Sequence, residues 1–196
     1  MIRLFKKNKL LFVLGISSII CFIIGILFNS FIDDNNKLII SNNISFLIDN
    51  ISRDKVSSFS NFFTLFLSSS FIIFIIWIFG ISIIGILFIY LLYLFKVFIF
   101  SFEFVSLLIN LKLNNILYIF IYLFPSAVYI LLLFFISYYS LSFSFMLFKL
   151  IFKKQSINIT FYIKSYFKVF FISLIVCLVN CIIEVFIIPK ILLFLF

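Results

Sequence analysis

Long uncharged runs of apolar residues constrain this chain more than any other feature of its sequence. The first run covers residues 10–28 and directly follows four cations, Arg3, Lys6, Lys7 and Lys9. At ~1.5 Å of rise per residue, a helix of this length crosses the ~30 Å hydrocarbon core of a bilayer. The run exceeds the ~7–15 apolar residues of a typical signal peptide, and no cleavage site of small residues follows it. We therefore expect a permanent membrane span.

Four further runs predict four more spans. They cover residues 71–95, 97–111, 116–148 with an interruption at Pro125, and 166–188. The chain has 66% hydrophobic and 11% charged residues, against roughly 45–50% and 25% in soluble domains. This balance excludes a soluble enzyme, a disordered tail and a secreted disulfide domain. The predicted fold class is an all-α integral membrane protein, in which residues 1–196 form one transmembrane domain, a five-span helical bundle.

The placement of the charges predicts the orientation of this bundle. With five spans and a cytoplasmic N-terminus, every Asp lies outside, and ten of the 15 cations lie in the cytoplasm. These ten are Arg3, Lys6, Lys7, Lys9, Lys96, Lys149, Lys153, Lys154, Lys164 and Lys168. If the short run 97–111 were instead a re-entrant loop, only seven cations would remain inside. The positive-inside rule therefore favours five spans and an external C-terminus.

The net charge of +9 is a topology signal on this interpretation and not a nucleic-acid-binding surface. The cations are scattered between apolar runs and form no single basic face. We therefore expect no nucleic acid among the partners, and membrane lipid as the main surrounding.

The longest segment outside the predicted spans is the external stretch 29–70. Apolar residues recur within it at helical spacing, and polar residues occupy the other faces. This pattern predicts an amphipathic helix in the first external loop. Two interpretations stay open: a docking surface for an extracytoplasmic partner, or a helix that only covers the bundle.

Two acids, Glu103 and Glu184, lie within the predicted spans, where a charged side chain is costly and is a functional candidate by default. On the last span Glu184 shares a stripe with Asn180, and small residues continue that stripe at Ser173, Cys177 and Cys181. Such stripes also serve close helix packing in lipid. An ion or proton pathway and a merely packed bundle both remain possible. We expect Glu103 and Glu184 to lie toward opposite membrane faces.

The chain carries no recognisable set of catalytic or metal-binding residues. It contains no His, its three Cys lie inside apolar runs without a CxxC pair, and it has no Gly-rich phosphate loop. Catalytic pairs that depend on His are therefore excluded. We expect no enzyme activity, no cofactor and no metal site.

Several short motifs occur in an order that resembles one bacterial membrane family. Gly80 and Gly85 lie five residues apart, Pro125 follows Leu123 and Phe124, and the acid Glu184 is followed five residues later by Pro189. This order resembles the stage II sporulation protein M family over nearly the whole chain. The candidate family-motif or helix-packing residues are Gly80, Gly85, Glu103, Pro125, Asn180, Glu184 and Pro189. The sequence departs from the family at Val97 and Ser101, where glycine is usual, and at Ser126 and Ala127, where polar residues are usual.

The resemblance implies a non-enzymatic scaffold of the bacterial cell membrane. Its partners would be wall hydrolases similar to stage II sporulation proteins D and P, anchored during septal peptidoglycan degradation and engulfment. The alternative is a membrane subunit of a small transporter or exporter, with Glu103 and Glu184 on the route.

Overall fold

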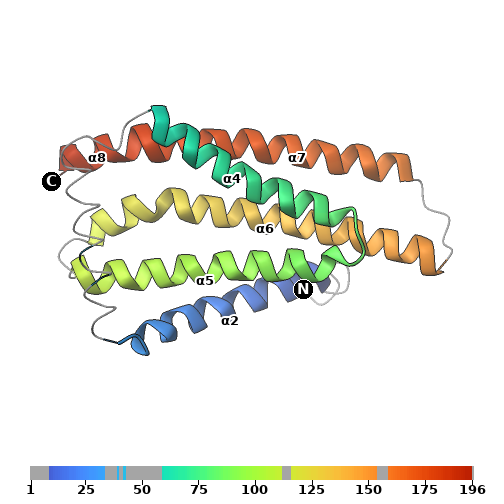
Figure 1. Ribbon diagram of the computed structural model, residues 1–196, viewed down its shortest axis with the longest axis horizontal. Coiled ribbons are helices and arrows are strands. Elements are labelled where there is room, and N and C mark those ends of the chain that lie inside the picture. Colours follow the sequence, from blue (N-terminus) through green and yellow to red (C-terminus); the bar gives the residue numbers. More distant parts are fainter. Residues whose placement is uncertain are drawn as a thin grey trace, which may run out of the picture.

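The computed structural model describes residues 9–33, 39, 42, 59–111, 116–153 and 159–195. Its long elements are the helices α2 (Lys9–Ser30), α4 (Phe59–Gly80), α5 (Gly85–Leu111), α6 (Ile116–Lys153) and α7 (Ile159–Ile182). The last helix continues through a π-helical turn, η2 (Ile183–Ile187), into α8 (Ile188–Leu195), and the three form one rod (Figure 1). Among these described residues, five helical segments are long and apolar enough to cross a membrane. The predicted all-helical fold with five such segments is confirmed.

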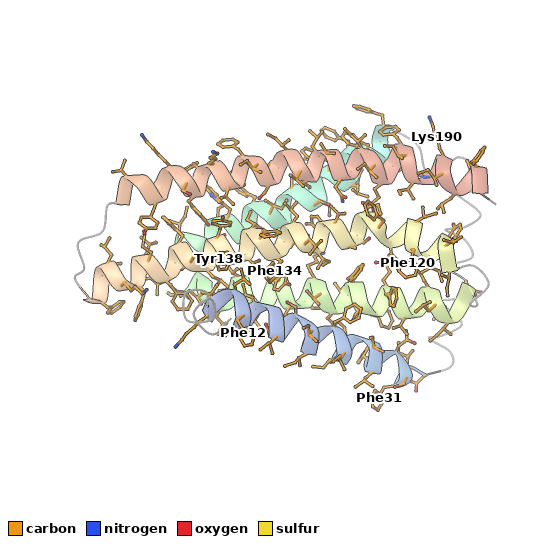
Figure 2. The ribbon with its side chains drawn as sticks, turned by 180° about the vertical axis from the view of Figure 1, so that it is seen from behind. Phe12, Phe31, Phe120, Phe134, Tyr138 and Lys190 are labelled. Atoms are coloured by element: carbon orange, nitrogen blue, oxygen red, sulfur yellow. The ribbon has the colours of Figure 1, made fainter. Side chains whose placement is uncertain are left out.

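The outside of the bundle is covered with apolar side chains. Ile19, Leu67 and Leu131 are each more than half exposed, and Phe31, 80% exposed, points away from the bundle at the end of α2 (Figure 2). A surface of this kind would aggregate in water. In lipid such an apolar surface is favourable. The helical backbone also suits a bilayer, because each helix pairs its own backbone polar groups. The chain is therefore a multi-pass protein of the cell membrane.

The four helices α4, α5, α6 and α7 surround a common centre, and α2 packs on the outside against α5 (Figure 1). Polar side chains join α2 to α5 at both ends of their contact. The Ser18 and Tyr93 hydroxyl oxygens lie 2.7 Å apart, and the Asn29 amide nitrogen donates a 2.8 Å bond to the Ser106 hydroxyl oxygen. Interhelical hydrogen bonds of this kind hold helices together in lipid, where no hydrophobic drive does so.

The second and third helices do not follow the predicted ranges 71–95 and 97–111. The second helix runs from Phe59 to Gly80, a turn occupies residues 81–84, and the third helix runs without a break from Gly85 to Leu111. Hydropathy missed the turn because its residues are mostly apolar. The signal was the glycine pair that brackets Ser82, since a side chain at Gly85 would collide with the Phe79 carbonyl group and only glycine fits this turn.

Residues 59–70 were predicted to lie in the external segment because they are rich in Ser, Thr and Asn. The structure places them in α4 instead. Here Thr64 donates a 2.9 Å hydrogen bond from its hydroxyl group to the backbone carbonyl of Ser60, one turn earlier. A hydroxyl group that donates to a carbonyl of its own helix keeps a hydrogen-bond partner when it moves from water into lipid. Ser and Thr residues can therefore lie within a membrane helix.

The predicted interruption at Pro125 is also wrong, because α6 continues through this proline without a break. The whole helix has 38 residues. At about 1.5 Å per residue α6 is about 57 Å long, so it extends beyond a ~30 Å hydrocarbon core. Neighbouring helices can satisfy the backbone groups that a proline frees inside a membrane helix.

The ends of the bundle are distinct. The helix α2 begins on the right-hand side of Figure 1, near the α4–α5 turn, whereas α8 ends on the left. The predicted amphipathic pattern, residues 40–53 of the external stretch 29–70, lies outside the described residues except for residue 42, which is helical.

Candidate functional site

A polar pocket of about 200 Å³ lies where the four central helices meet. Every one of these helices contributes a polar side chain to its wall. They are Ser69 from α4, Lys96 and Glu103 from α5, Ser126 and Tyr129 from α6, Asn180 from α7 and Glu184 from η2, and apolar residues complete the lining. The pocket thus collects both intramembrane acids and one lysine.

Glu103 and Glu184 lie at similar depth, so the expectation that they approach opposite membrane faces is wrong. Glu103 lies on α5 and Glu184 on the rod of α7, η2 and α8, and these two rods run in the same direction (Figure 1). Glu103 is eight residues, or about 12 Å, from the end of α5 at Leu111, and Glu184 is eleven residues, or about 16 Å, from the end of α8. The error came from starting the third helix at Val97, which placed Glu103 near the wrong end.

Lys96 was assigned to a cytoplasmic loop, and the structure places it inside α5. It lies eleven residues, or about 16 Å, beyond Gly85, and its side chain lines the pocket. Glu103 follows seven residues later on the same helix, about 10 Å further along the axis. Lys96 therefore belongs among the intramembrane charges, which are functional candidates by default. In the sequence, Lys96 is a single cation between two apolar runs. This pattern is the same for a loop between two helices and for a lysine inside one helix, so the position of Lys96 could not be predicted.

Asn180 is tied to α6 through its side-chain nitrogen. Its amide nitrogen donates a 3.1 Å hydrogen bond to the backbone carbonyl oxygen of Pro125. Because a carbonyl oxygen can only accept, this contact fixes which end of the amide faces Pro125. The amide oxygen is left on the other side, buried and without a hydrogen-bond partner. A buried acceptor without a donor costs about 1–3 kcal/mol.

Glu184 lies in the π-helical turn η2, and the proline that follows explains the turn. Pro189 has no backbone N–H, so the carbonyl of Val185 cannot receive its usual bond from a residue four positions later. The chain widens to five-residue spacing instead, as in the bond from the Ile188 N–H to the Ile183 carbonyl. Single π-turns within α-helices often occur at functional sites. Pro189 itself is buried beside this turn.

Gly80 and Gly85 lie away from the pocket, at the α4–α5 turn. A side chain at Gly80 would collide with the Tyr166 hydroxyl group and with Ser140. The Tyr166 hydroxyl donates to the Trp77 carbonyl oxygen at 2.6 Å and lies 3.0 Å from the Ser140 hydroxyl oxygen. Gly80 thus permits α4 to pack closely against Tyr166 of α7 and Ser140 of α6. The structure therefore places the two predicted glycines at a turn and Glu103, Asn180 and Glu184 in the pocket wall. Pro125 accepts the bond from Asn180, and Pro189 follows η2.

The pocket also contains polar residues that the sequence analysis did not select: Ser69, Lys96, Ser126 and Tyr129. Tyr129 connects two walls, because its hydroxyl group donates a 3.0 Å hydrogen bond to the Ser69 carbonyl oxygen. Cys177 and Cys181 are fully buried beside Asn180 on the same rod. Within the described residues, no three His, Cys, Asp or Glu side chains are grouped as metal ligands.

Comparison with known families adds one finding. The sequence model of the family named stage II sporulation protein M matches residues 10–189, which include most of α2 and all of α4 to η2. The chain belongs to the stage II sporulation protein M family. No curated protein and no solved structure matches it significantly.

The family match extends from the first helix through Pro189, so it includes every polar residue of the pocket. Two carboxylates and an unpaired amide oxygen can hold a cation or a proton between the helices, and the ammonium group of Lys96 offsets part of their negative charge. They contain no nucleophile and base pair of the kind that His-dependent hydrolases use.

Proposed function

We propose that this member of the stage II sporulation protein M family is a non-enzymatic membrane scaffold that anchors peptidoglycan-remodelling partners. The observation that supports this function best is the family match along all five membrane helices. The partners are wall hydrolases similar to stage II sporulation proteins D and P, and the process is wall degradation at the septum during engulfment. The partners would bind the connection between α2 and α4, residues 31–58.

The ends of this connection are attached to the rest of the bundle. On one side Asn29 bonds to Ser106 of α5, and on the other side the rings of Phe62 in α4 and Phe186 in η2 lie 6.0 Å apart. A partner held by the connection would therefore be held by the whole bundle. This attachment is what a scaffold requires.

The charges favour an external position for the connection. Nine of the 15 cations lie in the sequence before or at the start of α2, at or just after the end of α6, or in the first half of α7. These helix ends are at the opposite end of the bundle from the end of α2 and the start of α4, which the connection joins (Figure 1). All four Asp of the chain lie within or at the start of the connection. With Lys96 removed from the cytoplasmic group, the bias remains nine to five, and by the positive-inside rule this bias supports an external connection.

The scaffold is tested by exchanging residues 34–58 for a Gly/Ser linker of the same length and co-purifying a wall hydrolase of the same organism from detergent. We expect recovery of the hydrolase to be lost while thermal stability of the bundle is kept. The control is Lys164→Gln, which changes a charge at the opposite end and should leave recovery intact. Unchanged recovery with the linker would contradict the proposal.

The second candidate function is a membrane subunit of a small transporter or exporter. The pocket favours it, because polar groups of four helices converge there, including both acids. Ion or proton flux into liposomes that contain the protein, measured for wild type and for Glu103→Gln, distinguishes the two functions. Flux that Glu103→Gln abolishes without lowering thermal stability would support transport, and absence of flux from wild type would reject it.

A further inference from the structure

The pocket holds an unbalanced set of charges. Glu103 and Glu184 contribute two carboxylates and Lys96 one ammonium group, so the set carries one net negative charge when all three are ionised. The other polar groups in the wall are hydroxyl groups and the Asn180 amide. Among membrane helices an uncompensated charge is strongly unfavourable, because little water is present to solvate it. One further positive charge would complete the set.

The Asn180 oxygen is an independent sign of a missing ligand. The Asn180 side chain is 4% exposed and lines the pocket, and its oxygen has no hydrogen-bond partner. The bond from its nitrogen to Pro125 prevents the amide from turning around to present a donor instead. Such an acceptor is normally satisfied by a donor or by a cation.

We propose that the pocket binds one small monovalent cation, Na⁺ or K⁺, with the carboxylates of Glu103 and Glu184 and the Asn180 amide oxygen as ligands. Hard cations take oxygen ligands of these types. Lys96 sets the charge of the ion, because a monovalent cation brings the set to neutrality and a divalent cation leaves it positive. The inference rests on neither proposed function, since a scaffold can hold such an ion permanently and a transporter can move it.

Protons compete with the cation for the same carboxylates, so binding depends on pH. The titratable groups that face these carboxylates come from three sides. They are Lys96 on α5, Tyr122 and Tyr129 on α6, and Cys177 and Cys181 on α7. A proton on either carboxylate removes a negative charge that would hold the cation, so acid weakens cation binding.

Thermal unfolding of the purified protein in detergent tests this site. The protein is first freed of Na⁺ and K⁺ and then titrated with NaCl, KCl or N-methylglucamine chloride at constant ionic strength. We expect a saturable rise of Tm by several degrees with Na⁺ or K⁺ and none with N-methylglucamine, because only a bound ligand stabilises the folded state. Equal Tm in the three salts would overturn the proposal. A parallel titration with CaCl₂ checks the charge of the ion, and a rise with Ca²⁺ but with neither monovalent ion would also overturn it.

Two variants and a control locate the effect. Glu103→Gln and Glu184→Gln keep the shape of the side chain and should lose the cation-dependent rise, whereas Lys190→Gln, outside the pocket, should keep it. A rise of the same size in both Gln variants rejects the site. Equilibrium binding of radioactive Na⁺ or K⁺ to wild type needs no variant to fold. It should saturate at one ion per chain, and no saturable binding of either ion would overturn the proposal.

Discussion

The Asn180 amide nitrogen donates a 3.1 Å hydrogen bond to the backbone carbonyl of Pro125. This bond joins two of the candidate family-motif or helix-packing residues, 55 positions apart in the sequence, and fixes α7 against α6 beside the pocket. It also determines which way the amide oxygen points. The same contact thus contributes to packing and prepares the pocket wall.

Asn180→Leu should lower the stability of the bundle. The replacement removes the bond to Pro125, and interhelical hydrogen bonds in membranes contribute about 1 kcal/mol. Thermal unfolding in detergent with saturating Na⁺ or K⁺, where the wild-type amide oxygen has its ligand, measures the change, and we expect a lower Tm. The control is Val179→Leu, on a half-exposed neighbour that should leave Tm unchanged. A Tm for Asn180→Leu at or above that of wild type would show that the bond does not stabilise the fold.

Gly80→Ala should destabilise the junction of α4, α6 and α7. The added methyl group meets the Tyr166 hydroxyl group and Ser140, and overpacking of this kind costs about 1–3 kcal/mol. Gly15→Ala is the matched control, because a side chain there has open space around it. The prediction is a lower Tm for Gly80→Ala alone, and it fails if the two variants unfold at the same temperature.

Tyr166→Phe tests the polar half of the same junction. The phenyl ring can still stack on Phe143, 4.4 Å away between ring centroids, but the bonds to the Trp77 carbonyl and to Ser140 are lost. We expect a loss of about 1 kcal/mol in the free energy of unfolding. The control is Tyr139→Phe, whose side chain is exposed and should tolerate the change. Equal stability of the two variants would contradict this role for the hydroxyl group.

The orientation can be measured with single cysteines and a maleimide that does not cross membranes. Phe194→Cys lies near the end of α8, and Thr160→Cys lies near the start of α7, at the opposite end of the bundle. With the C-terminus outside, intact cells should label Phe194→Cys, and Thr160→Cys should react after the membrane is opened. The reverse pattern would invert the topology.

Hydropathy predicted five membrane helices because each is long and apolar, and the structure has five such segments. It misplaced the second and third helices, since residues 81–84 form a turn without a polar run and Lys96 resembles a loop residue. The stripe on the last helix was predictable from spacing: Ser173, Cys177 and Cys181 are buried. The pocket was not, because it depends on the relative depth of helices that are far apart in sequence.

Glu103 and Glu184 line one pocket at similar depth in the bundle, and a distance between spin labels tests this central claim most directly. The labels are attached to Glu103→Cys and Glu184→Cys after the three native cysteines are replaced by alanine. The control pair combines Glu103→Cys with Thr160→Cys, which lies at the other end of the bundle. We predict strong dipolar broadening for the first pair and none for the control. A separation of the first pair near the ~30 Å thickness of the hydrocarbon core would place the two acids at opposite membrane faces and contradict the claim.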